Sequence, residues 1–125
     1  MEGRRSRNVV PWKVTYHDGS SNGYVFSRSS SNGPIHFEYI PVTLERSSSG
    51  TYSGGEPVKA SIHVEEEAGL WRWVDRLDAE LDLHTDARMM GTGAFCIQTP
   101  LYERKFVMKR TSLLGDFHAY VQKFR

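Results

Sequence analysis

Residues 58–83, with the sequence VKASIHVEEEAGLWRWVDRLDAELDL, contain the change of periodicity that decides the fold class. Up to Val64, apolar and polar residues alternate, as they do along a half-buried strand. Beyond Glu65, apolar residues recur at the spacing of one helical face, at Leu70, Val74, Leu77 and Leu81. The stretch therefore predicts a strand that is followed by a helix running to about Leu83.

The segment on the N-terminal side of this stretch, from Val9 onwards, also has a period of two. It predicts three further strands, at 12–17, 24–26 and 35–44, with Pro41 marking an edge or a bulge in the last of them. The turns between the strands are rich in Gly, Asn and Ser, which turns favour. Because these connections are short, we expect the four strands to pair as an antiparallel meander.

The segment on the C-terminal side predicts a second hairpin and a second helix. Residues 94–99 and 105–110 have the composition of two strands, and Thr111 or Ser112 can cap a helix whose apolar residues continue to Phe124. The expected fold class is α+β: an antiparallel β-meander of four strands, then a helix, a β-hairpin and a C-terminal helix, with both helices packed on one face of one sheet. We expect residues 1–8 to form a flexible basic tail and residues 9–125 a single domain.

The composition argues against several classes of protein. Sixteen Lys and Arg stand against fifteen Asp and Glu, so the chain lacks the basic excess of dedicated nucleic-acid modules. The single cysteine, Cys96, rules out an intrachain disulfide, and no apolar run approaches the roughly 20 residues of a membrane span. The N-terminus lacks the apolar core of a secretion signal, so we expect a small soluble protein in the cytoplasm. A monomer and a homodimer are both consistent with the sequence.

The serine- and glycine-rich loops are the first candidate site. Small residues allow backbone N–H groups to point together at an anion, and an arginine stands at the entrance of two of these loops. The longest loop, 46–55, is also suited to docking on a protein partner. The candidate binding residues are Arg28, Arg46, Ser47, Ser48, Ser49 and Tyr52.

Histidines on the predicted strands form a second candidate site. They alternate with apolar neighbours, and the strand register decides whether they meet on the solvent-facing side of the sheet. Imidazole and carboxylate groups suit zinc or another transition metal. The candidate ligands are His17, His36, His63 and Glu38, but neither His-x-His nor His-Glu-x-x-His spacing is present. The main expectation is therefore that the chain holds no metal and no cofactor.

Three other features have structural explanations. Cys96 is a candidate nucleophile, but its place between two large apolar residues favours a buried, inert thiol. The Gly91-Thr-Gly93 motif precedes a predicted strand, so it predicts a turn and not a dinucleotide site. Basic and aromatic residues interleave over 102–110, as they do in proteins that bind single-stranded nucleic acid, but the same strand must bury Phe106 in the core.

The chain shows no readable nucleophile–base or acid–base pair, so its catalytic residues, if any, stay unassigned. The expected function is that of a small non-enzymatic module that binds a protein partner or a small anionic ligand through its Ser/Gly-rich loops. Two alternatives stay open. One is a small metal-dependent or hydrolytic enzyme that uses the strand histidines. The other is a protein that contacts nucleic acid through the basic tail and the C-terminal hairpin.

Overall fold

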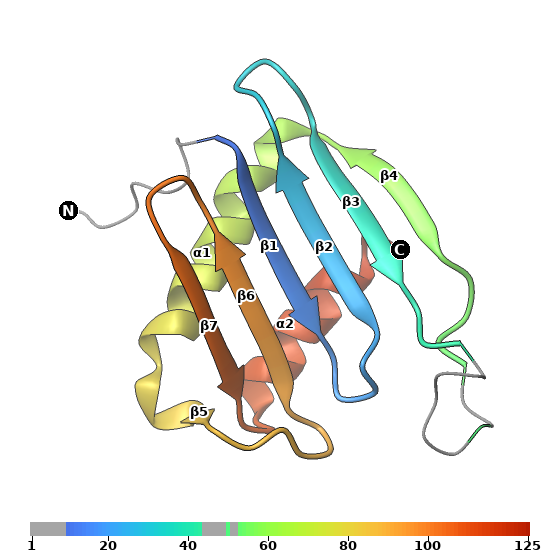
Figure 1. The fold of residues 1–125 in the computed structure, drawn as a ribbon, viewed down its shortest axis with the longest axis vertical. Helices are drawn as coiled ribbons and strands as arrows, with labels where there is room; N and C mark the ends of the chain where they lie inside the picture. The colour runs from blue at the N-terminus through green and yellow to red at the C-terminus, as the bar shows by residue number, and fades with distance from the viewer. Residues whose placement is uncertain (1–9, 44–49, 51–52) are drawn as a thin grey trace.

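Seven antiparallel strands in one sheet and two α-helices make up the fold (Figure 1). The computed structural model describes residues 10–43, 50 and 53–125, so the predicted basic tail lies outside the described part. The strands are β1 (Trp12–His17), β2 (Gly23–Arg28), β3 (Ile35–Ile40), β4 (Val58–Ile62), β5 (His84–Thr85), β6 (Gly93–Gln98) and β7 (Glu103–Met108). The helices are α1 (Glu67–Ala79) and α2 (Ser112–Gln122), and single 3₁₀ turns flank α1 at Val64–Glu66 and Leu81–Leu83. The expected mixture of one antiparallel sheet and two helices is confirmed.

Strand β1 lies in the middle of the sheet. The order of strands is β4-β3-β2-β1-β6-β7-β5, so β1 to β4 form a meander and the β6–β7 hairpin pairs with the other edge of β1. The register aligns Val14 with Phe26 on one side and with Ile97 on the other. Core-facing residues are thereby brought into continuous rows across the sheet.

Most element boundaries lie within two residues of the predicted ones, but two of them differ by four residues. Strand β3 ends at Ile40 and does not reach residue 44, because Pro41 follows and has no N–H to extend the ladder. The helix that was predicted to continue to Leu83 ends at Ala79. There the His84 ring donates a hydrogen bond of 3.0 Å to the carbonyl oxygen of Leu77, which a longer helix would have used itself.

The chain beyond α1 forms a 3₁₀ turn and strand β5, neither of which the sequence predicts. His84 pairs with Met108 of β7, and a two-residue strand is too short to show a period. Leu81, which the pattern places on the buried stripe of the helix, lies in the turn instead and is 66% exposed. The apolar stripe of α1 is therefore one member shorter than its spacing suggests.

The core lies between the sheet and the two helices. The alternate residues Trp12, Val14 and Tyr16 of β1 are buried, as the period of two predicts. The helices bury two apolar stripes against them, made of Leu70, Trp71, Val74 and Leu77 in α1 and Leu114, Phe117 and Val121 in α2. The Tyr16 ring stacks on Phe95 with centroids 5.0 Å apart. Such ring pairs contribute about 0.5–1.5 kcal/mol each beyond the area that they bury.

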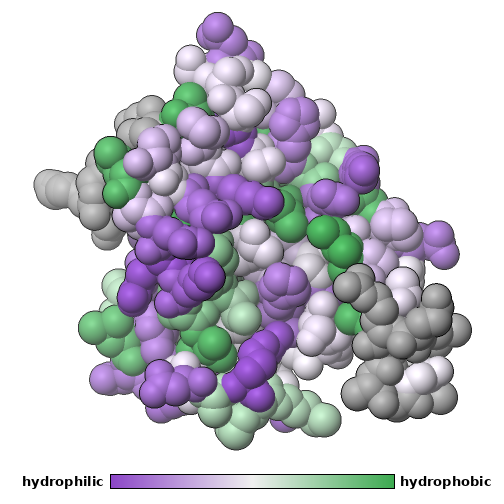
Figure 2. Space-filling model, viewed as in Figure 1, coloured by the Kyte–Doolittle hydropathy of each residue, from purple (hydrophilic) through white to green (hydrophobic). Residues whose placement is uncertain are grey.

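The opposite face of the sheet carries no helix in the described part of the chain (Figure 1). Figure 2 shows this face, where hydrophilic residues are mixed with smaller hydrophobic patches. Every aromatic residue within the strands is buried in the core, so none lies on this open face. Neither α1 nor α2 has the length and hydrophobicity that a bilayer-spanning helix needs.

Candidate ligand-binding pocket

Arg28, one of the predicted anion-binding residues, ends strand β2. Its guanidinium forms an ion pair with Glu67 (Nη1 to Oε1, 2.6 Å) and donates to the carbonyl oxygens of Gly33 (3.0 Å) and Ser31 (2.7 Å). These contacts hold the β2–β3 turn against the start of α1 and use all three guanidinium nitrogens. A role for Arg28 in binding an external anion stays a prediction. The other predicted binding residues lie outside the described part of the chain, namely Arg46, Ser47, Ser48, Ser49 and Tyr52.

The base of the long Ser/Gly loop is closed by hydrogen bonds. The Gly54 N–H donates to the carbonyl oxygen of Val42 at 2.9 Å, and the Tyr39 hydroxyl donates to the carbonyl oxygen of Gly54 at 2.6 Å. A Cβ at Gly54 would lie 2.0 Å from Asn22 Oδ1, so only glycine fits there. The guanidinium of Arg125 covers the Tyr39 ring at 3.9 Å from its centroid. The C-terminal residue therefore helps to close the loop, which no local pattern in the sequence indicates.

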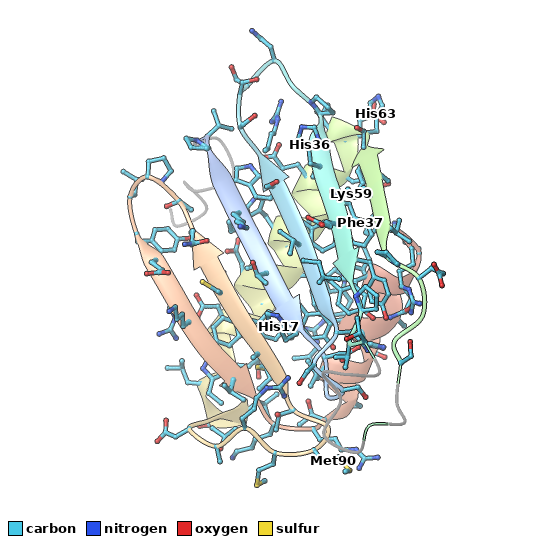
Figure 3. All side chains as sticks on the ribbon, turned by 45° about the vertical axis from the view of Figure 1, so that its right-hand side comes forward. His17, His36, Phe37, Lys59, His63 and Met90 are labelled. Atoms are coloured by element: carbon cyan, nitrogen blue, oxygen red, sulfur yellow. The ribbon has the colours of Figure 1, made fainter. Side chains whose placement is uncertain are left out.

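The structure does not bring the four candidate metal ligands together. His17 and His36 both lie on the open face, but the register separates them by four residues along the strands, roughly 13 Å at about 3.3 Å per residue. Glu38 lies between them, and His63 lies past the end of β4, where its Nδ1 accepts a hydrogen bond of 3.2 Å from the Glu65 N–H. Figure 3 shows His17 well apart from His36 and His63. No group of three or more His, Cys, Asp or Glu among the described residues is arranged to hold a metal ion.

Cys96 is half-buried on the open face of β6, and not enclosed in the core as its apolar neighbours suggest. Its Sγ lies 3.6 Å from Glu103 Oε2 on the neighbouring strand. Burial, together with the hydrogen bond and the negative charge of Glu103, raises the pKa of the thiol. Because the thiolate is the reactive form, this position disfavours Cys96 as a nucleophile.

A pocket of about 320 Å³ lies between the sheet and α2, at the end of the sheet where β1 meets β2. The β1–β2 turn, Gly91 and residues 110–118 surround it. The buried ring of Tyr16 and the side chain of Leu114 supply apolar surface, while Arg110 and His118 supply polar groups. This volume is at the lower end of the range for small-molecule sites.

The carboxylate of Asp18 fixes the shape of the β1–β2 turn. Its Oδ1 accepts hydrogen bonds from the backbone N–H groups of Ser20 (2.9 Å) and Asn22 (3.0 Å). Its Oδ2 accepts from the Asn22 amide (3.1 Å) and the Tyr24 hydroxyl (3.3 Å). Asp18 is only 7% exposed. Both oxygens are therefore already used within the protein.

Two loops meet at the pocket through glycine and arginine contacts. Arg88 ties them together by donating to the carbonyl oxygens of Asp18 (2.6 Å) and Thr92 (2.7 Å). A Cβ at Gly19 would lie 2.8 Å from the Cα of Gly91, so the two backbones touch. Gly91 has a φ of +85°, and a Cβ there would lie 2.7 Å from Cδ of Arg110. Position 91 thus requires glycine for two reasons: the turn needs a positive φ, and the Arg110 side chain occupies the space that a Cβ would fill.

A chain of hydrogen bonds runs beside the pocket. The Tyr16 hydroxyl oxygen lies 2.9 Å from Nδ1 of His118, and Nε2 of His118 lies 3.1 Å from Nε2 of Gln122. The same Gln122 nitrogen donates to the Tyr24 hydroxyl at 2.6 Å, which in turn donates to Asp18. The chain therefore links α2 to both β1 and β2.

The contact with Arg125 sets the direction of these hydrogen bonds. Arg125 donates to Oε1 of Gln122 at 3.0 Å, so the amide nitrogen of Gln122 points at His118. Because that nitrogen only donates, Nε2 of His118 must accept, and we assign the ring proton to Nδ1. Nδ1 then donates to the oxygen of Tyr16. The Tyr16 hydroxyl therefore accepts from His118, and its own hydrogen has no acceptor within this chain of hydrogen bonds.

The two phenols are held in their protonated form. Burial, followed by the negative charge of Asp18, raises the pKa of Tyr16 well above its usual value. Burial also raises the pKa of Tyr24 to about 12. At physiological pH both hydroxyls are hydrogen-bond donors, and neither is a base or a nucleophile. The pocket is suited to holding a hydrogen-bond acceptor.

The sequence predicts Tyr16 only as a core residue and does not group Arg110 with His118. The one local signal is the spacing of His118 and Gln122, which lie one helical turn apart and meet for that reason. No protein-family model, curated protein or solved structure matches the chain in comparisons with known proteins. A function for the pocket can therefore be proposed only from its own geometry.

Proposed function

We propose that this chain is a non-catalytic module that binds a small ligand in the pocket between the β1–β2 turn and α2. It is supported most by Tyr16, which lines the pocket and is only 2% exposed, and whose hydroxyl hydrogen has no acceptor in the chain of hydrogen bonds assigned above. A buried donor without an acceptor costs about 1–3 kcal/mol. A ligand that accepts from this hydroxyl would recover that free energy on binding.

Gly115 supports the same function from the side of the helix. It lies within α2 and lines the pocket. A Cβ at this position would meet no atom within 4 Å, and the backbone is outside the left-handed region, so the fold itself does not require glycine. A glycine inside a helix costs about 0.5–1 kcal/mol relative to alanine. The space that it leaves free belongs to the pocket, where a ligand would fill it.

The groups around the pocket favour binding over catalysis. Tyr16 and Tyr24 hold their protons at physiological pH because their pKa values are raised. Cys96, whose thiol is also held protonated, lies on the opposite face of the sheet. Tyr16 can supply a hydrogen bond to a ligand in the pocket, and none of these three residues is prepared to attack it.

The other expected functions have less support from the geometry. The strand histidines are too far apart to act as one metal site, which weakens the case for a metal-dependent enzyme. The open face of the sheet lacks the aromatic residues on which single-stranded nucleic acid stacks. Contact with a protein partner through the Ser/Gly loop stays a proposal, since most of that loop lies outside the described residues.

The proposal is tested by NMR with ¹⁵N-labelled protein and a library of neutral, cationic and anionic small molecules. We expect binders to shift the amide signals of Gly19, Gly91 and Gly115 together, because these three residues line the same pocket. Gly115→Leu should abolish the shifts by filling the space. Ala119→Leu is the matched control, because it adds the same side chain to an exposed position of α2 away from the pocket. Binders that map elsewhere, or that bind Gly115→Leu unchanged, would contradict the proposal.

A further inference from the structure

We propose that the ligand of this pocket is a small carboxylate with an apolar body, and that Arg110 and Tyr16 recognise its charged end. This inference rests on the proposed function and adds the chemical class of the ligand. It depends on which polar groups around the pocket are free and which are already used.

Arg110 presents a guanidinium that the protein itself does not use. Its side chain lies against Gly91, where the missing Cβ makes room for Cδ. Its guanidinium makes no hydrogen bond or ion pair with any residue that the structure describes. Arg28, in contrast, is bound to Glu67. A guanidinium held by its stem and free at its tip is suited to pairing with a carboxylate through two parallel hydrogen bonds.

The carboxylate and imidazole acceptors at the pocket are used, whereas the Tyr16 hydroxyl and the Arg110 guanidinium are free to donate. Both carboxylate oxygens of Asp18 accept hydrogen bonds within the turn, so a cationic ligand has no free carboxylate to bind there. Nε2 of His118 accepts from Gln122. A ligand can accept from the hydroxyl hydrogen of Tyr16 and the N–H groups of Arg110, and the neutral hydroxyls of Ser20 and Thr111, which also line the pocket, can donate as well. Because the free charged group is the positive guanidinium of Arg110, the complementary ligand is an anion.

The size and the apolar walls of the pocket narrow the class of anion. The volume of about 320 Å³ suits a small molecule. Leu114, which is 5% exposed, and the ring of Tyr16 offer apolar surface for the body of such a molecule. A fully hydrated anion such as inorganic phosphate makes no use of these walls. A short aliphatic or aromatic carboxylate uses both the donors and the walls.

The experiment compares ligands of the same shape and different charge. Acetate, hexanoate and benzoate represent the carboxylates, benzamide is the neutral counterpart of benzoate, and inorganic phosphate is the fully polar anion. Dissociation constants are measured from the amide shifts of Gly91 and Gly115. We expect benzoate or hexanoate to bind at least about 10-fold more tightly than benzamide and phosphate, because a charged hydrogen bond is lost with benzamide and apolar contact with phosphate.

The variants test the two recognising residues separately. Arg110→Gln should weaken carboxylate binding at least about 10-fold, whereas Lys109→Gln should change it less than about 2-fold, since Lys109 bonds to the carbonyl oxygen of Asp82 and not to the pocket. Tyr16→Phe should weaken binding about 5-fold. Tyr120→Phe is its control, because it also removes a buried hydroxyl, but one away from the pocket. Arg110 is exposed, so its variant should fold.

The outcomes separate the two proposals. Carboxylates that bind no better than benzamide, or that bind Arg110→Gln as tightly as the wild type, overturn the ligand class. If neutral molecules still shift the pocket signals and Gly115→Leu abolishes those shifts, the proposed function stands while this inference fails. If no molecule of either charge perturbs the pocket, both fail.

Discussion

The ion pair between Arg28 and Glu67 should be one of the main polar contributions to stability. Its nitrogen and oxygen are 2.6 Å apart, and the two side chains are only 15% and 10% exposed. The second oxygen of Glu67 accepts a hydrogen bond of 3.1 Å from the indole of Trp12. Arg28→Met keeps most of the aliphatic stem but leaves the buried Glu67 carboxylate without its charged partner, with the Trp12 indole still donating to it.

The magnitude follows from the burial of the charge that is left behind. Removing one partner of a buried pair costs about 3–5 kcal/mol. Because both side chains keep some contact with water, we expect the lower end, about 3 kcal/mol, for Arg28→Met. Glu67→Gln keeps an oxygen for Trp12 and removes the charge. The double variant should therefore be less destabilised than the sum of the single variants, by about 1–3 kcal/mol.

The assay is unfolding by urea, monitored through tryptophan fluorescence. The slope of the unfolding free energy against urea concentration (the m-value) should be the same for all variants. Lys59→Met is the control, because Lys59 is 81% exposed and 4.0 Å from Glu38, and it should not alter the free energy of unfolding measurably. The reasoning is refuted if Arg28→Met destabilises the protein no more than Lys59→Met does. Arg28 would then be available to bind an external anion, as its position at a loop entrance suggests.

Three further predictions concern other parts of the fold. Gly115→Ala and Gly69→Ala should each raise the free energy of unfolding by up to ~1 kcal/mol, because both glycines lie within helices and a Cβ fits at each: it would meet no atom within 4 Å at Gly115, and only the Tyr120 hydroxyl, at an ordinary contact distance of 3.5 Å, at Gly69. A lower urea midpoint for either variant contradicts this. Burial raises the pKa of Tyr120 to about 12, so stability is lost as the pH rises from about 10 towards 12. Between neutral pH and about pH 11, the midpoint temperature of thermal unfolding should fall less for Tyr120→Phe than for the wild type. Equal falls in the two proteins would contradict this role of Tyr120. Glu103→Gln should move the pH profile of Cys96 alkylation by iodoacetamide to lower pH, since Glu103 helps to raise the thiol pKa; an unshifted profile excludes that role.

The buried face of β1 is predictable because it depends on a period that the sequence itself carries. Trp12, Val14 and Tyr16 alternate with polar residues, and all three are buried in the structure. The end of α1 is different, because it depends on the His84 ring and on pairing with β7. Those partners come close only once the sheet has formed. Strand β5 therefore exists because of its neighbour and not because of its own residues.

The pocket could not be predicted from spacing. Tyr16 and His118 are separated by 102 positions, and neither has a motif that points to the other. Arg28 illustrates the same limit, since the sequence places it at a loop entrance but does not show that Glu67 takes its guanidinium. The chemistry of a side chain is known from its type. Whether that chemistry is free for a ligand depends on partners that the fold supplies.

The central place of β1 has a consequence for how the chain reaches its fold. Thr15 pairs with Val25 across a short turn, but it pairs with Cys96 only after α1 has been made. Because closing a large loop is slower than closing a small one, the meander and the β6–β7 hairpin should form as separate units. Their joining along β1 should then set the folding rate. During synthesis, the edge of β1 that pairs with β6 stays unpaired until β6 has been made. Until then, this edge can pair with the strands of other chains.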